Sequence, residues 1–169
     1  MQLAEAATRS GQGSEAEHKD RILDFAVSRS PAIFYVADWD EMPYPTFISS
    51  NLETITGHPV SAFLEDQDFG RGLLHPEDRE AYFQAVRDLK TVGQACAEYR
   101  FRNSEGQYLW FRDDLRFSPG EGGKADEVVG CMIDITRQKR AETSFKDAEA
   151  LKSEIVDAAL DAIVVADED

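Results

Sequence analysis

The feature that most constrains the fold is a run of alternating apolar and charged residues that leads through a short turn into a second long run. The run ACAEYRFR, residues 95–102, alternates with a period of two, and YLWFRDDLRF, residues 108–117, follows as a second long run. Such alternation is typical of a strand with one buried and one solvent-facing side. The residues NSEG lie between the runs, and Gly106 is able to adopt the positive φ of a hairpin turn. This stretch therefore predicts an antiparallel sheet.

The rest of the chain supplies further strands and several helices. Runs rich in branched and aromatic residues indicate strands, and apolar residues spaced by three and four indicate helices. The predicted order is a helix over 19–30, strands over 32–38 and 45–50, helices over 51–57, 59–66 and 75–93, the two strands of the hairpin, and a strand over 127–136. Because the helices separate the first two strands from the last three, we expect an α+β domain with one sheet. The helix cluster covers one face of the sheet, and the other face requires flanking helices or another subunit.

Charge and composition narrow the function classes. The 169 residues carry a formal net charge of −15. No nucleic-acid partner is expected, because such a surface repels phosphates. No apolar run reaches membrane-spanning length, and the first 20 residues lack the continuous apolar core of a signal peptide. Cys96 and Cys131 form no CxxC pair and no disulfide framework, so we expect a cytoplasmic location.

The C-terminal residues repeat the pattern with which the domain begins. RILDFAV, residues 21–27, matches SEIVDAAL, residues 153–160, at isoleucine, aspartate and alanine positions, and both segments lead from helix-like to strand-like residues. A repeat of this kind indicates tandem units. We therefore expect the N-terminal fragment of a longer multi-domain protein. The expected boundaries are a frayed N-terminus over 1–19, a domain over 20–136, a coiled-coil-like helix over 137–160, and the start of a second domain over 161–169.

Four stretches, in this order, resemble the PAS family in the subgroup that carries a PAC segment. They are FISSNLETITGHPVSAFL, LLHPEDREAYFQAV, EYRFRNSEGQYLWFRDDLR and VVGCMIDITRQKRAE, and together they span roughly residues 20–140. The resemblance implies a five-stranded antiparallel sheet with strand order 2-1-5-4-3. It also implies sensing or protein–protein interaction, usually upstream of a histidine kinase or of an enzyme of cyclic-dinucleotide turnover, and a second PAS domain that begins near the C-terminus.

The same resemblance places any ligand between the sheet and the helices. From the alternation we expect twelve residues to form the wall of this space: Phe34, Val36, Phe47, Leu52, Ile55, Phe63, Tyr82, Val86, Tyr99, Phe101, Leu109 and Met132. The alternative is that these side chains simply fill the core, since aromatic residues pack a small space completely. The adjacent acids Asp113 and Asp114 are expected on the solvent face.

Cofactors and catalysis find little support in the sequence. Flavin photochemistry of the light-oxygen-voltage type needs a reactive cysteine, and the matching stretch EDQDFGRGLLHPED has none. Haem needs an axial ligand, for which His75 is the only candidate near the cavity helix, yet it stands at a predicted helix start. No histidines are spaced as a metal pair. No cofactor is the expected state, with haem or another flavin chemistry left open, and no catalytic residues are predicted.

The end of the last strand is the expected output of the domain. By resemblance, Asp134, Ile135 and Thr136 couple the sensor core to whatever follows, and Thr136 is also able to cap the next helix. Apolar residues in helix 137–160 follow the spacing of a coiled-coil seam. We therefore expect a sensory module that regulates a downstream domain of the same chain, and a homodimer through its N-terminal and C-terminal helices. The alternatives are a ligand-free dimerisation or protein-interaction module, and a haem or flavin sensor of redox state or gas.

Overall fold

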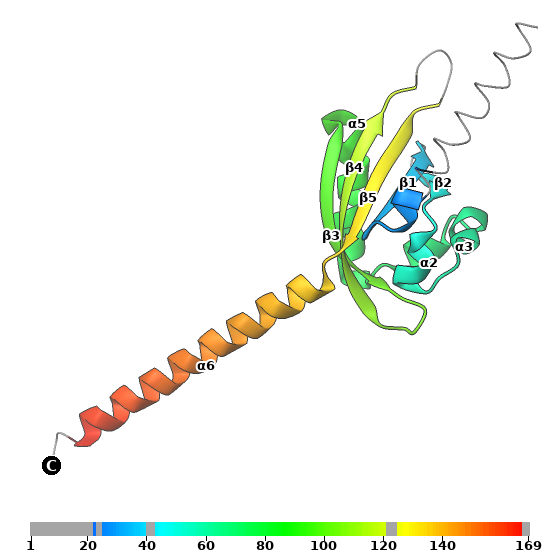
Figure 1. Cartoon of the computed structure of the whole chain (residues 1–169). Helices are drawn as coiled ribbons and strands as arrows, with labels where there is room; N and C mark the ends of the chain where they lie inside the picture. Colours follow the sequence, from blue (N-terminus) through cyan, green and yellow to red (C-terminus); the bar gives the residue numbers. More distant parts are fainter. Residues whose placement is uncertain (1–21, 23–24, 40–42, 121–124, 167–169) are drawn as a thin grey trace, which may run out of the picture. The chain divides into compact units, whose positions relative to one another are not determined.

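The computed structural model describes residues 22, 25–39, 43–120 and 125–166, and side chains as far as residue 155 (Figure 1). The chain divides into two compact units, Met1–Asp134 and Ile135–Asp169. Residue 22 and residues 25–28 are helical, as expected for the N-terminal helix. The expected frayed segment 1–19 lies outside the described residues.

The first unit is built on one antiparallel sheet. Its strands are β1 Ala32–Asp38, β2 Tyr44–Ile48, β3 Gln94–Arg102, β4 Tyr108–Ser118 and β5 Glu127–Asp134. They are arranged in the order β2-β1-β5-β4-β3, with every neighbouring pair antiparallel. The predicted fold class and strand order are therefore confirmed. The predicted hairpin is present as β3 and β4, and Gly106 in its turn has a φ of 81°.

Short helices connect β2 to β3. They are α2 Asn51–Thr56, α3 Val60–Glu65, α4 Phe69–Leu73, the 3-10 turn η1 Pro76–Asp78, and the longer α5 Arg79–Val92. Gly57 ends α2 with a φ of 75°, the left-handed conformation expected of a helix C-cap glycine. Helices α2, α3 and α5 pack along the sheet (Figure 1).

The core lies between these helices and one face of the sheet. Ile33 of β1, Phe111 of β4 and Leu89 of α5 have no exposed surface. Aromatic rings link the layers, since the Phe63 ring of α3 stacks on Phe101 of β3 with 6.2 Å between centroids. Phe101 in turn meets Phe111 edge to face at 5.9 Å. Such aromatic pairs stabilise a core beyond the burial of their area alone.

The second unit is a single long helix, α6 Thr136–Ala166. Its first backbone bond runs from the Lys139 amide to the Ile135 carbonyl, at 2.9 Å. Residues 161–166 are helical, so the predicted strand start there is wrong. A strand needs a neighbour for its backbone hydrogen bonds, whereas a helix satisfies them within itself. Residues 167–169 lie outside the described residues, and a second domain starting at 161 stays a prediction.

A partly buried ion pair ties η1 to strand β3. The Arg100 guanidinium donates to both carboxylate oxygens of Asp78, at 2.8 and 2.7 Å, and the Arg100 amide donates to Asp78 at 2.8 Å. The two side chains are 25% and 15% exposed. Hydrogen bonds from Arg100 hold the pKa of Asp78 below its usual value, although burial opposes this.

We expect Arg100→Leu to lower the free energy of unfolding by about 1–2 kcal/mol, because it leaves the half-buried Asp78 carboxylate without its charged donor. Urea unfolding followed by circular dichroism measures the change. The matched control is Arg112→Leu, whose bond to Asp114 spans 3.3 Å between side chains that are 51% and 45% exposed. It should cost less than about 0.5 kcal/mol. Equal losses in the two variants would contradict this role of the Asp78–Arg100 pair.

Candidate functional site

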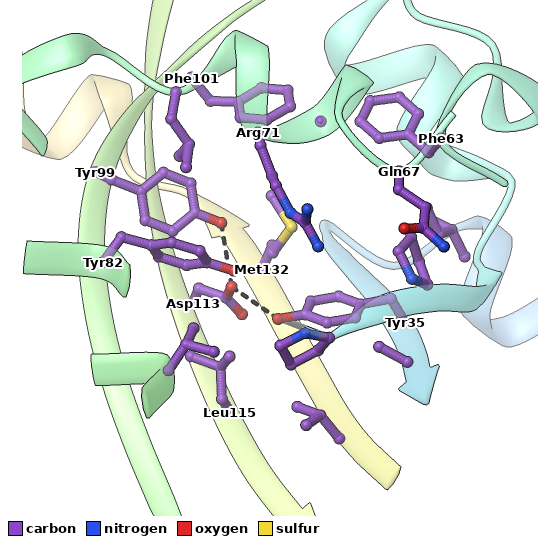
Figure 2. Close-up of a pocket in the computed structure, with 18 of the residues that line it drawn as sticks. Tyr35, Phe63, Gln67, Arg71, Tyr82, Tyr99, Phe101, Asp113, Leu115 and Met132 are labelled. Atoms are coloured by element: carbon purple, nitrogen blue, oxygen red, sulfur yellow. Dashed lines mark hydrogen bonds between the residues drawn. The ribbon is translucent and has the colours of Figure 1, made fainter. Parts of the chain in front are cut away.

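A cavity of about 130 Å³ lies between the inner face of the sheet and the helices (Figure 2). Its wall is mostly apolar and aromatic, with a few polar groups. The lining residues come from all five strands, from helices α2 to α5 and from the segments beside them: Tyr35, Ala37, Pro43, Pro45, Ile48, Leu52, Phe63, Asp66, Gln67, Gly70, Arg71, Leu74, Tyr82, Phe83, Val86, Tyr99, Phe101, Asp113, Leu115, Val128 and Met132. An apolar cavity with a few convergent polar groups is the usual form of a small-molecule site.

A carboxyl group lies at the centre of the polar part of this wall. Asp113 of β4 is 0% exposed. Its Oδ2 accepts hydrogen bonds from the Tyr35 hydroxyl at 2.9 Å and from the Tyr99 hydroxyl at 3.1 Å. Its Oδ1 is buried and has no hydrogen-bond partner among the residues that the structure describes. Figure 2 shows the hydroxyl groups of Tyr35, Tyr82 and Tyr99 directed toward this carboxyl. Because a buried polar atom without a partner costs free energy, Oδ1 marks a place where a bonding group is missing.

Burial has the largest effect on the pKa values of Asp113 and of the three tyrosines around it. It raises the pKa of Asp113 to about 7, while the hydrogen bonds from Tyr35 and Tyr99 act in the opposite direction. Burial, and then the charge of Asp113, raise the pKa of Tyr35 and of Tyr99. Burial likewise raises the pKa of Tyr82. The tyrosines therefore remain hydroxyl donors at neutral pH, whereas the carboxyl group changes its charge in that range.

The backbone explains why these side chains meet. Asp113 stands opposite Ala97 on β3 and Met132 on β5, so β4 presents Phe111, Asp113 and Leu115 on one face. Tyr35 stands opposite Gly130 of β5. A Cβ atom at position 130 would overlap the Tyr35 ring. The glycine thus leaves the space through which the ring crosses β5 to reach Asp113.

Helix α4 contributes a cation on the other side of the cavity. Figure 2 shows the Arg71 side chain extending into the space between Tyr99 and Gln67. Its Nη1 donates to Asp68 at 3.1 Å, and the Arg71 side chain is 28% exposed. The neighbouring Asp66 also belongs to the lining. The positive charge at this end is therefore offset by local carboxylates.

The structure brings seven of the twelve predicted wall residues to the cavity, and their role toward a ligand stays a prediction. These are Leu52, Phe63, Tyr82, Val86, Tyr99, Phe101 and Met132. The other five lie elsewhere. In β1, Ile33, Tyr35 and Ala37 face the helices, so Phe34 and Val36 lie on the opposite side of the sheet. The sequence prediction therefore chose the wrong set of alternate residues in β1 as the inward-facing ones. All residues of AIFYVA are apolar or aromatic enough for either face of the sheet, so a shift of one residue is not visible in the sequence.

Three further predicted wall residues, Phe47, Ile55 and Leu109, also lie outside the cavity lining. Phe47 of β2 is 47% exposed, because Ile48 takes the core position at the end of that strand. Ile55 and Leu109 are partly buried against the main core cluster without reaching the cavity. Asp113, expected on the solvent face, is fully buried, while its neighbour Asp114 is half-exposed. The alternation of β4 was the signal for Asp113, since this residue falls in phase with Phe111 and Leu115.

The three residues predicted to couple the domain to the next helix, Asp134, Ile135 and Thr136, lie where β5 ends and α6 begins. Asp134 is the last residue of β5 and is exposed, and Thr136 is the first residue of α6. Ile135 and Thr136 are 8% and 6% exposed. Their coupling role stays a prediction.

The cavity does not suit a large cofactor. Its volume is below the roughly 300–1,000 Å³ of pockets that hold drug-sized ligands, and haem and flavin are larger still. His75 is absent from the cavity lining, and its Nδ1 accepts a hydrogen bond from the Glu77 amide at 3.3 Å. Among the described residues, no group of three or more His, Cys, Asp or Glu side chains is arranged to hold a metal ion. No helix in the described part of the chain has the length and hydropathy to span a membrane.

Comparisons with known proteins agree with this architecture. A family model described as PAS fold matches residues 45–132. The two-component sensor PprA of Pseudomonas aeruginosa is 30% identical over 139 residues, which are 82% of this chain and 15% of that relative. The chain therefore spans only a small part of the length of this curated relative.

Solved structures show the same fold. The N-terminal domain of a diguanylate cyclase with a PAS/PAC sensor from Marinobacter aquaeolei is 26% identical, with a TM-score of 0.54 over 64% of this chain and 98% of that one. A sensory box histidine kinase/response regulator from Burkholderia thailandensis is 21% identical, with a TM-score of 0.59 over 78% of this chain and 98% of that one. With the sheet order, the helix cluster and the family match in agreement, the chain belongs to the PAS family.

Proposed function

We propose that the domain is a sensory module that controls a downstream output domain through helix α6. The observation that supports this proposal is the position of β5. This strand contributes Met132 to the cavity wall, ends two residues later at Asp134, and is followed at once by α6. A change of packing in the cavity therefore has a short covalent route to the helix. Elements with two discrete arrangements transmit such changes.

The relatives suggest the class of output. Their names describe a two-component sensor, a diguanylate cyclase and a histidine kinase/response regulator. We propose that this domain has no catalysis of its own and regulates a kinase or a cyclic-dinucleotide enzyme encoded in the same chain. A cytoplasmic location suits this role.

A homodimer would give α6 a partner on which to act. Phe145, Leu151 and Ile155 of α6 are 65%, 58% and 61% exposed in the single chain. Apolar residues at these spacings fit the seam of a paired helix. Ile22 and Phe25 of the N-terminal helical residues are also more than half exposed. We propose that both helices contribute to the dimer, and native mass spectrometry of the chain tests this. A ligand-free dimerisation module, the second candidate, would give a dimer that retains no small molecule.

We expect Asp134→Ala in the full-length protein to change the output activity severalfold in the basal state, the stimulated state or both. The reason is that Asp134 is the last residue of β5 before the α6 junction. The measurement is the activity of the output domain with and without stimulus. Glu127→Ala, at the exposed first residue of the same strand, is the matched control and should leave output unchanged. Unaltered basal and stimulated output in Asp134→Ala would refute the junction proposal.

A further inference from the structure

Asp113 is a buried acid whose bonding is half complete. One carboxylate oxygen accepts hydrogen bonds from two tyrosine hydroxyls, whereas the other is buried and finds no partner in the described part of the chain. The sheet does not need an acid at this position, since an apolar residue would fill the same space in phase with Phe111 and Leu115. A buried acid that lines a cavity and keeps one oxygen unpaired indicates that the missing partner comes from outside the chain.

We propose that this cavity binds a small alkyl or aromatic ammonium ion, whose positive group bonds to Oδ1 of Asp113 and whose apolar body fills the remaining space. This inference rests on the proposed sensory function and names the ligand class of that function.

Three observations favour a cation over other donors. First, the donors to Asp113 within the part of the chain that the structure describes are two neutral tyrosines and no Lys or Arg, so an ammonium ion would supply the missing countercharge. Second, the hydroxyl groups of Tyr35, Tyr82 and Tyr99 are directed toward the carboxyl, and a hydroxyl oxygen is able to accept a hydrogen bond from an ammonium group. Third, the formal net charge of −15 favours the approach of a cation over that of an anion.

The size of the cavity limits the ligand. A volume of about 130 Å³ is close to the roughly 150 Å³ of an apolar cavity that accommodates benzene. The ligand body is therefore of the size of a five- or six-membered ring or a branched alkyl chain. Leu115, Val86 and Met132 provide apolar contacts around Asp113.

Other charged and titratable groups also face this space. They are Tyr35 on β1, Tyr82 on α5, Tyr99 on β3, Arg71 on α4 and Asp66 after α3, with Asp114 adjacent to Asp113 in β4. The tyrosines stay neutral because their pKa values are raised, and Arg71 is paired with Asp68. Asp113, whose pKa is about 7, is therefore the group that changes charge near neutral pH. An ammonium ion binds the ionised form, so affinity should rise as the pH increases through this value.

Isothermal titration of the 169-residue chain with three probes of one shape tests the proposal: cyclopentylamine, cyclopentanol and cyclopentanecarboxylate. We expect the amine to bind at least about tenfold more tightly than the alcohol at about pH 8, with no binding of the carboxylate. In buffers of different ionisation enthalpy, amine binding should release close to one proton at about pH 6 and almost none at about pH 8.

Two variants separate the site from general attraction of cations. Asp113→Asn and Asp114→Asn each remove one negative charge, but only the first removes the buried carboxyl. We expect Asp113→Asn to abolish the preference for the amine and Asp114→Asn to keep it. The wild-type chain by itself is able to overturn the inference. It would do so if it bound amine and alcohol with equal affinity, preferred the carboxylate, or bound none of the probes. None of these results affects the Asp134→Ala output assay. The proposal of an ammonium ligand and the proposal of output control through α6 are therefore tested independently.

Discussion

The Asp113→Asn variant should lose most of the fall in stability that the wild-type chain shows between about pH 4 and pH 8. Asp113 has a pKa of about 7 in the folded protein, against an ordinary value of 3.8. Each pKa unit corresponds to about 1.4 kcal/mol, so the difference amounts to about 4 kcal/mol. Urea unfolding at a series of pH values, followed by circular dichroism, measures the free energy of unfolding of both proteins.

The sign of the effect follows from proton binding. Between its two pKa values the carboxyl is protonated in the folded chain and ionised in the unfolded chain, so unfolding releases a proton. Stability from Asp113 is therefore complete below about pH 4, falls as the pH rises, and is lost above about pH 7. Asp78 and Asp126 act in the opposite direction, because their pKa values are lowered in the folded state by hydrogen bonds from Arg100 and Lys90. The difference between variant and wild type removes these shared contributions.

Asparagine is nearly the same shape as a protonated aspartate, so the variant keeps an oxygen that accepts from Tyr35 and Tyr99. Its free energy of unfolding relative to wild type should rise by up to about 4 kcal/mol from pH 4 to pH 8. Asp114→Asn, on the half-exposed neighbour, should follow the wild-type curve. Parallel curves for Asp113→Asn and wild type would show that Asp113 is not a buried acid of raised pKa.

The sequence predicted the architecture well because the architecture depends on repeating patterns. Strand β3 alternates between charged and apolar residues over residues 99–102, and a turn with Gly106 follows it, so the period and the turn are both visible in the sequence. The long helix α5 likewise shows spacings of three and four. The strand order was implied by the family resemblance and is confirmed.

The details of the candidate site depend on properties that no single segment reveals. Strand β1 is apolar on both sides, so its sequence does not distinguish Phe34 from Tyr35 as the inward residue. Asp113 is an acid of a kind that normally stays in water, and the two tyrosine hydroxyls that donate to it in the core come from distant segments of the chain.

Asn51 illustrates the same limit in a structural residue. Asn51 is the first residue of α2, and its side chain bonds to groups outside that helix. Its amide donates to the carbonyls of Ser30 and Ala32, at 2.9 and 2.8 Å, and its Oδ1 accepts from Ser49. Ser30 and Ala32 lie just before and at the start of β1, 21 and 19 residues away in the chain. Local helix signals do not contain that information.

The Gly130→Ala variant should lose about 3 kcal/mol of unfolding free energy. The new Cβ atom would overlap the ring of Tyr35, which crosses β5 at this point. Overpacking in a core costs about 1–3 kcal/mol, and displacement of Tyr35 also breaks its hydrogen bond to Asp113. Urea unfolding at about pH 5 measures the loss while Asp113 is protonated. Gly72→Ala is the matched control, because a Cβ atom there meets nothing within 4 Å, and it should not destabilise the chain.

A double-mutant cycle with Tyr35→Ala assigns the loss to this one contact. If the overlap with the Tyr35 ring is the cause, Gly130→Ala should cost less than about 1 kcal/mol in the Tyr35→Ala background, because the ring is no longer present. The same displacement removes a hydrogen bond that favours the ionised carboxyl, so Gly130→Ala should also raise the pKa of Asp113 further and steepen the fall in stability toward neutral pH. Equal costs of Gly130→Ala in both backgrounds would mean that strand β5 itself, and not the tyrosine that crosses it, requires the glycine.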